Sequence, residues 1–201
     1  LHRQGAVTGE ADTKQLLSRI EGESIRMGSL VEDLLLLARL DQAREMAHLP
    51  VDIAQVTKDA VASAQVAGPD HEISLSGNLD ELYTLGDQHR IHQVVANLLA
   101  NARTHTPAGT AIAVSIAQSS DGVRIAVSDS GPGLSEEDQR RIFERFYRAD
   151  SSRVRNDGEG SGLGLSIVDA VMKAHGGSVS VDSEVGKGST FTLFFPHPTE
   201  V

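Results

Sequence analysis

The stretch between Asp87 and His105 predicts a helix with two different long faces, and it constrains the fold of this chain more than any other feature. One face is an apolar stripe at helical spacing, formed by Ile91, Val94, Val95, Leu98, Leu99 and Ala102. The adjoining face is polar and consists of Arg90, Gln93, Asn97, Asn101 and His105. Such a helix is buried on one side and borders a polar space on the other, and Asp87 is a suitable N-cap for it.

Two asparagines one turn apart make the polar face unusual. Asn is a mediocre helix former that favours caps and turns, yet Asn97 and Asn101 lie in the middle of the helix and point the same way. Amide oxygens are hard ligands that suit Mg²⁺, which takes few protein ligands and completes its shell with phosphates and water. Taken alone, two buried amides satisfied by hydrogen bonds are the simpler interpretation.

The rest of the chain mixes strands and helices without strict alternation, which indicates an α+β fold with helices layered on one sheet. Strands are predicted within 51–55, 71–77 and 82–87, as a hairpin of 110–117 with 122–129, and as a final pair within 178–196. Further helices are predicted at 54–66 and at 163–175, the second ended by Gly176 and Gly177.

The N-terminal region predicts one long helix over residues 13–42. Its apolar residues repeat at spacings of four and three, as in a coiled-coil seam, with Glu23 interrupting the pattern. They are Leu16, Ile20, Met27, Leu30, Leu34 and Leu37. We favour an oligomerising helical hairpin over a core helix of the main domain. A linker of residues 41–50 ended by Pro50 then separates an appendage, residues 1–45, from a main domain, residues 46–201.

Composition excludes several classes of function. The net charge of −10 argues against nucleic acid or an anionic membrane as a partner, and the absence of Cys excludes thiol chemistry and Cys-ligated zinc. No apolar run is long enough to span a membrane. Because the chain starts at Leu1 rather than Met, we expect it to be part of a longer protein.

Two glycine-rich segments carry candidate ligand-binding residues. Asp129 ends an apolar strand in "DSGPGL", where Gly131 and Gly133 let the backbone turn closely, so its carboxylate can accept from an exocyclic amine such as that of adenine. In "GEGSGLGLSIV", Gly160, Gly162 and Gly164 precede or open a helix whose free backbone N–H groups suit phosphate. An ordinary tight turn and a flexible loop remain the plainer interpretations of these two segments.

Basic and aromatic residues gather between those segments. Residues 140–155 hold six of the eighteen basic residues of the chain: Arg140, Arg141, Arg145, Arg148, Arg153 and Arg155. With Phe143, Phe146 and Tyr147 to dock it, this segment predicts a lid over an anionic ligand, although a solvated run of charge is the alternative. In "GKGSTF", Thr190 is placed to reach a ligand near Asp129.

Five motifs in this order resemble those of sensor histidine kinases. "NLLANA", "DSGPGL", "FERFYR", "GSGLGL" and "GKGSTF" look like the asparagine, glycine and phenylalanine boxes of that family, over residues 50–196. The resemblance implies a two-layer α/β sandwich, a mixed sheet under three helices, as in the gyrase and chaperone ATPases. It also implies that residues 1–45 are the remnant of a dimerisation and phosphotransfer hairpin.

The resemblance assigns roles to individual residues. Asn101 would coordinate Mg²⁺, Asn97 would lie beside the phosphates of ATP, and Asp129 would bind the adenine amine. The other residues implied for the nucleotide site are Arg103, His105, Gly131, Gly133, Arg148, Gly160, Gly162, Leu163, Gly164, Leu165 and Thr190. A family Lys or Arg is replaced by Thr104, and the neighbouring Arg103 points about 100° away on a helical wheel.

The implied activity is transfer of the γ-phosphoryl of ATP to a His of the hairpin and then to an Asp of a response regulator, within a homodimer. No His of this chain has the sequence context of the family's phosphoacceptor, which we expect upstream of Leu1 in a membrane-anchored sensor with this part in the cytoplasm. An ATP hydrolase of the same fold is the alternative, but such relatives carry Glu where this chain has Asn97. A non-catalytic ATP-responsive dimerisation module is a third possibility.

Overall fold

The computed structural model describes residues 10–41, 47–149 and 161–197. The helices are α1 (Glu10–Asp41), α2 (Ile53–Ala67), α3 (Gln88–His105), α4 (Glu136–Arg141) and α6 (Gly164–Ala174). The strands are β1 (Leu49–Asp52), β2 (Ile73–Gly77), β3 (Tyr83–Gly86), β4 (Ile112–Ser119), β5 (Gly122–Asp129), β6 (Ser178–Glu184) and β7 (Gly188–Pro196). Every helix and strand predicted from the sequence is present, with ends shifted by a few residues.

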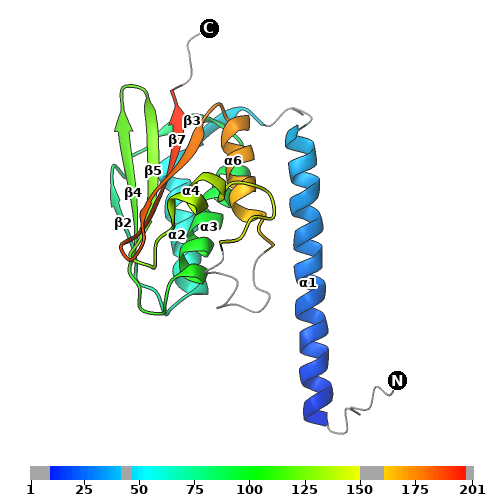
Figure 1. Ribbon diagram of the computed structural model, residues 1–201. Helices are drawn as coiled ribbons and strands as arrows, with labels where there is room; N and C mark the ends of the chain where they lie inside the picture. Colours follow the sequence, from blue (N-terminus) through cyan, green and yellow to red (C-terminus); the bar gives the residue numbers. More distant parts are fainter. Residues whose placement is uncertain (1–9, 42–46, 150–160, 198–201) are drawn as a thin grey trace.

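The main body is a two-layer sandwich, as predicted. Five strands form one sheet in the order β2-β4-β5-β7-β6, in which β2 pairs parallel with β4 and all other pairs are antiparallel. Helices α2, α3 and α6 cover one face of this mixed sheet (Figure 1). The α+β fold class is therefore confirmed.

The core lies between the sheet and the helices. Alternate residues of the central strands point into it, Val123, Ile125 and Val127 from β5 and Phe191, Leu193 and Phe195 from β7. The apolar stripe of α3 faces the same core, and Leu98 and Leu99 are fully buried there. Asp87 caps α3 as predicted, because its carboxylate accepts from the backbone N–H of Arg90 at 3.1 Å.

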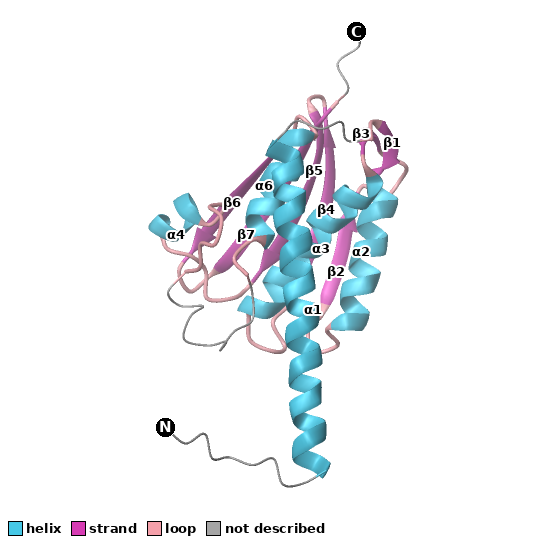
Figure 2. Cartoon of the chain, turned by 90° about the vertical axis from the view of Figure 1, so that its right-hand side faces the viewer, coloured by secondary structure: helices cyan, strands magenta, loops and turns pink. Residues whose placement is uncertain are grey.

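Helix α1 is divided between two environments. Near its C-terminal end, Leu36 and Leu37 are buried in the core cluster and the helix packs against α6. Figure 2 shows α1 in front of α6, with its N-terminal part projecting beyond the body. The predicted seam residues Leu16, Ile20 and Met27 are 45%, 54% and 62% exposed. The core-helix interpretation thus holds for the C-terminal part, and oligomerisation through the seam stays a prediction.

The predicted linker is shorter than expected. Strand β1 starts at Leu49, includes Pro50 and pairs antiparallel with β3 in a small separate sheet. A proline is tolerated in a two-stranded sheet because a strand there has an edge that needs no N–H donor. Residues 42–46 of the predicted linker lie outside the described residues. Among the helices that are described, none has the length and apolar character needed to cross a bilayer.

Candidate active site

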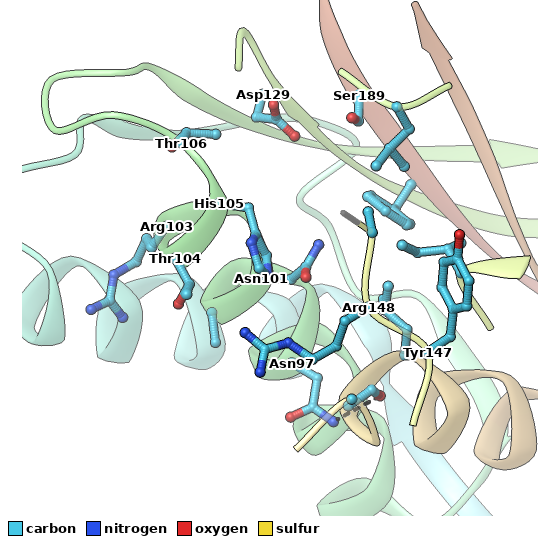
Figure 3. Close-up of a pocket in the computed structure, with 18 of the residues that line it drawn as sticks. Asn97, Asn101, Arg103, Thr104, His105, Thr106, Asp129, Tyr147, Arg148 and Ser189 are labelled. Atoms are coloured by element: carbon cyan, nitrogen blue, oxygen red, sulfur yellow. Dashed lines mark hydrogen bonds between the residues drawn. The ribbon is translucent and has the colours of Figure 1, made fainter. Parts of the chain in front are cut away.

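A cavity of about 840 Å³ opens between the polar face of α3, the end of β5 and the start of α6. Figure 3 shows Asn97, Asn101 and His105 along α3, with Asp129 and Ser189 on the sheet side and Arg148 near Asn97. The structure therefore brings together the asparagine pair, the strand-end aspartate and the glycine-rich helix start, which lie far apart in the sequence.

The two asparagines of α3 differ in their hydrogen bonds. The Asn97 amide donates to the carbonyl oxygen of Gly164 at 3.4 Å, a long bond that ties α3 to the start of α6. Asn101 is half-buried on the cavity wall, and its side chain forms no hydrogen bond within the described part of the chain. A half-buried amide oxygen left without a protein donor fits a hard cation such as Mg²⁺. The described residues hold no cluster of three or more His, Asp or Glu side chains for a metal.

Asp129 is held by the backbone at the last position of β5. One carboxylate oxygen accepts from the N–H of Gly131 at 2.8 Å, and the N–H of Ser189 also donates to this carboxylate. Burial raises the pKa of the Asp129 carboxyl above its usual value, while these two donors and the positive charge of His105 act in the opposite direction. The backbone thus orients this acceptor before any ligand arrives.

The two glycines after Asp129 have different roles. Gly133 lines the cavity with a φ of +69°, and a Cβ there would lie 2.1 Å from the carbonyl oxygen of Glu184. Gly131 does not line the cavity, and a Cβ there would lie 2.7 Å from the Asp129 carboxylate and 2.6 Å from the Thr106 methyl group. Gly131 thus shapes the site from behind, because it lets the backbone close onto Asp129.

The glycine-rich helix start borders the cavity as predicted, with one correction. Gly162, Gly164 and Leu165 line the cavity, and the first turn of α6 lacks a side-chain cap. Its backbone N–H groups are available to an anion, which the positive end of the helix dipole also favours. Leu163, predicted as a binding residue, is instead fully buried in the core, where an apolar side chain is most stable. Gly160 lies outside the described residues.

The basic segment contributes less to the cavity than the lid hypothesis predicted. Arg148 lines the cavity, but Arg140 and Arg141 pair with glutamates of their own helix, Glu136 and Glu137. Arg153 and Arg155 lie outside the described residues. The interpretation as a solvated face thus applies to part of the run.

The aromatic residues of this segment dock it only in part. Phe143 packs edge-on against Phe191 of β7, with ring centroids 6.4 Å apart, and the hydroxyl of Tyr147 donates to Asp138 at 2.8 Å. Phe146 is 59% exposed, so the predicted docking by its ring is wrong. Its backbone N–H instead donates to the carbonyl oxygen of Gly162 at 2.9 Å, and this bond ties the segment to the start of α6.

Two further predicted binding residues differ in their relation to the cavity. Arg103 is among the residues that line it, and its guanidinium donates to the carbonyl oxygen of Ala67 at the end of α2, at 2.8 Å. Thr190 contacts the hydroxyl of Ser128 at 2.9 Å on the sheet face that the helices leave open. Side chains alternate along a strand, so Ser189 and not Thr190 lies beside Asp129 in the cavity wall. The prediction for Thr190 was therefore wrong by one residue, whereas Arg103 lines the cavity and also joins α3 to α2.

The cavity-lining residues that sequence reasoning missed include Ser189, Thr106 and Asp33. The alternation of Ser189 with Phe191 and Leu193 was a usable signal for Ser189. Thr106 follows α3 directly, where its hydroxyl donates to the carbonyl oxygen of Ala102 at 2.8 Å. Asp33 comes from α1, and burial, followed by the charge of Glu32, raises its pKa. No sequence signal placed it here, because only the packing of α1 on the body brings it to the cavity.

Residues 86–199 match the family described as histidine kinase-, DNA gyrase B- and HSP90-like ATPases. The probable sensor histidine kinase TcrY of Mycobacterium tuberculosis is 48% identical over 170 residues, covering 85% of this chain and 36% of TcrY. The sensor-like histidine kinase SenX3 of Mycolicibacterium smegmatis is 37% identical over 194 residues, covering 95% of this chain and 50% of SenX3. The chain thus spans no more than half the length of these two relatives.

Solved structures agree with this assignment. The mycobacterial sensor histidine kinase MprB superposes with a TM-score of 0.65 at 28% identity, covering 76% of this chain and 99% of that one. Full-length ShkA in complex with AMPPNP gives a TM-score of 0.76 at 29% identity, covering 97% of this chain and 41% of ShkA. The chain therefore belongs to the family of histidine kinase-, DNA gyrase B- and HSP90-like ATPases, as the ATP-binding catalytic domain of a sensor histidine kinase.

Proposed function

We propose that this chain binds ATP with Mg²⁺ and transfers the γ-phosphoryl group to a His on a helical hairpin, from which it passes to an Asp of a response regulator. Residues 1–45 would belong to that hairpin, through which the intact protein dimerises, and residues 46–201 to the catalytic domain. The whole protein would be a membrane-anchored sensor with this part in the cytoplasm. The observation that carries the proposal is the cavity, in which a strand-end carboxylate faces two amides of α3 and the start of α6.

Each wall of the cavity has a chemical task in this proposal. Asp129 would accept a hydrogen bond from the adenine amine, since it lines the cavity. The first-turn N–H groups of α6 and the guanidinium of Arg148 would hold the phosphates. The amide oxygen of Asn101 would hold Mg²⁺, which when bound neutralises charge on the phosphates. Catalysis would rest on positioning and on charge stabilisation rather than on a protein acid or base.

The residue at position 97 supports transfer over hydrolysis. A general base must accept a proton from the attacking water, and a neutral amide is unable to do so. Asn97 already donates to the carbonyl oxygen of Gly164 and offers no carboxylate to the cavity. An imidazole nucleophile needs no such base, because its neutral ring nitrogen carries a lone pair. Slow hydrolysis and faster transfer to histidine are therefore expected.

The test uses γ-labelled ATP, Mg²⁺ and two proteins. This chain is mixed with a longer form of the same protein that includes the upstream helix and carries Asp129→Ala. Label on the longer protein that is stable to base and labile to acid is expected, and it should disappear when this chain carries Asn101→Ala. Thr190→Val, on the open face of the sheet, is the matched control and should leave labelling intact. Free phosphate without labelled protein would contradict the proposal and favour a hydrolase.

A further inference from the structure

His175 forms one hydrogen bond with each ring nitrogen at the end of α6. Its Nδ1 lies 2.8 Å from the carbonyl oxygen of Val171, which can only accept, so Nδ1 carries the proton. Its Nε2 lies 3.0 Å from the backbone nitrogen of Asp87, whose N–H donates to it. The ring is therefore neutral, with the proton on Nδ1, and both nitrogens are used.

The partner of Nε2 is the residue from which α3 begins. Asp87 is the N-cap of α3, so its N–H is fixed by His175 while its carboxylate accepts from Arg90. The ring is partly buried and lies edge-on to Phe195, with centroids 6.4 Å apart. A Cβ on Gly86 would lie 2.6 Å from Cδ2 of this ring, so only glycine leaves room for it.

Helices α3 and α6 form two walls of the cavity and are joined by polar contacts at both ends. At the cavity end, the contact is the 3.4 Å bond from Asn97 to Gly164, which lies where ligand groups would compete for it. At the far end, the contact is the shorter bond between His175 and Asp87, two residues that do not line the cavity. The far contact thus fixes α3 against α6 whether or not the cavity contact is exchanged.

We propose that His175 is a positioning residue of the nucleotide site: its neutral Nδ1–H form sets α3 relative to α6 and with it the placement of Asn97 and Asn101. Protonation of Nε2 would turn an acceptor into a donor that faces the N–H of Asp87, and the bond would be lost. Nucleotide affinity would then fall. The inference depends on one part of the proposed function, namely that Mg-ATP binds in the cavity.

The surroundings favour the neutral ring at neutral pH. Burial is the main cause that lowers the pKa of His175 below its usual value, and the nearby His48 lowers it further. The hydrogen bond to Val171 and the negative charge of Asp87 act in the opposite direction. Because the folded-state pKa lies below the unfolded value of about 6.5, the contribution of the bond is complete above that pH. It is lost as the pH falls through the folded-state pKa.

The test compares His175→Gln, His175→Ala and the wild type by the Kd of a fluorescent ATP analogue with Mg²⁺, from pH 7.5 to pH 5. The Gln Oε1 reaches the position of Nε2 and accepts from Asp87 at every pH. At pH 7.5 we expect the Gln variant to match the wild type and the Ala variant to bind about fivefold more weakly, as for one lost hydrogen bond. Below the folded-state pKa of His175, we expect the wild type to bind about fivefold more weakly than the Gln variant.

The paired design removes other sources of pH dependence. All other titrating groups, ATP included, are common to the wild type and the Gln variant. The ratio of the Kd values of these two proteins therefore reports on His175 alone. A ratio that stays at one while the imidazole ¹⁵N signals show protonation of His175 would overturn the inference. So would an imidazole ¹⁵N spectrum that places the proton of neutral His175 on Nε2. Failure of the wild type to bind nucleotide at pH 7.5 would instead contradict the proposed function.

Discussion

The two ends of the cavity are built differently. At the strand end, made by Asp129, Gly131, Gly133 and Ser189, polar groups are satisfied by the protein itself, since two backbone N–H groups hold the carboxylate of Asp129. At the helix end, made by Asn97, Asn101, Arg148 and the start of α6, the amide of Asn101 has no hydrogen bond within the described residues. The bond from Asn97 is long, at 3.4 Å.

This difference indicates that the two ends of the cavity contribute to ligand binding in different ways. Buried polar groups that lack partners carry a free-energy cost, and a ligand that supplies the partners removes it. The strand end is therefore formed before binding and should select the base by shape and one acceptor. The helix end is completed by the charge of the ligand and should respond to Mg²⁺ and phosphate. The following predictions test each end separately.

The largest effect is expected from rigid backbone contacts at the strand end. A Cβ on Gly188, which has a φ of +110°, would lie 1.9 Å from the carbonyl oxygen of Asp129. We expect Gly188→Ala to lower the free energy of unfolding by about 2–5 kcal/mol, because strain and overpacking add. Gly186, in the same turn with a φ of +83°, has no atom within 4 Å of its Cβ position. Gly186→Ala should cost only about 1–2 kcal/mol. If urea unfolding gives the two variants the same loss in free energy of unfolding, the backbone near Asp129 can move to accommodate the added Cβ.

At the helix end, Asn101→Ala should separate function from stability. Because the side chain makes no hydrogen bond among the described residues, we expect the free energy of unfolding to change by less than about 0.5 kcal/mol. Phosphoryl transfer should fall about 10²-fold, the scale of losing one group that stabilises charge. Gln93→Ala, on the same polar face but outside the cavity, should retain transfer. A drop in the free energy of unfolding as large as the free-energy equivalent of the lost transfer rate would contradict this contrast between the strand end and the helix end.

Asp129→Asn tests whether the strand end trades stability for recognition. The pKa of this carboxyl is raised in the folded state, so the ionised group opposes folding at pH values above that pKa. We expect the Asn variant to be more stable than the wild type at pH 7 and to bind ATP about tenfold more weakly, because one acceptor is altered. The stability difference should shrink as the pH falls through the folded-state pKa of Asp129. If thermal unfolding shows that the stability difference between the two proteins grows at low pH, the pKa of Asp129 is lowered in the folded state rather than raised.

The smallest effect concerns the contribution of α1 to the cavity. Asp33 lines the cavity, so its carboxylate would repel the phosphates of a bound nucleotide. We expect Asp33→Asn to strengthen ATP binding about twofold, since salt and solvent screen a half-exposed charge. Glu32→Gln removes an exposed neighbouring charge outside the cavity and should change the Kd less. Calorimetry at low and high salt would check this, and an unchanged Kd at low salt would place the phosphates away from α1.

Much of this protein was readable from the sequence because periodicity reports directly on burial. The apolar stripe of α3, the alternation of β5 and β7, and the caps at Asp87 and Gly176 are local patterns with local physical causes. The order of five motifs predicted the family. The same reasoning placed Asn97, Asn101, Asp129, Gly133 and Gly164 at one site, and all five line the cavity.

Only the tertiary structure decided which neighbouring residue faces the cavity. Ser189 rather than Thr190 lies beside Asp129 because the register of β5 with β7 sets the faces of the sheet. Leu163 fills the core and Asp33 reaches the cavity from α1, each through contacts between segments distant in sequence. Local sequence determines what an element is, since its propensity and periodicity lie within a few residues. Where each side chain points depends on partners that only the folded chain brings together.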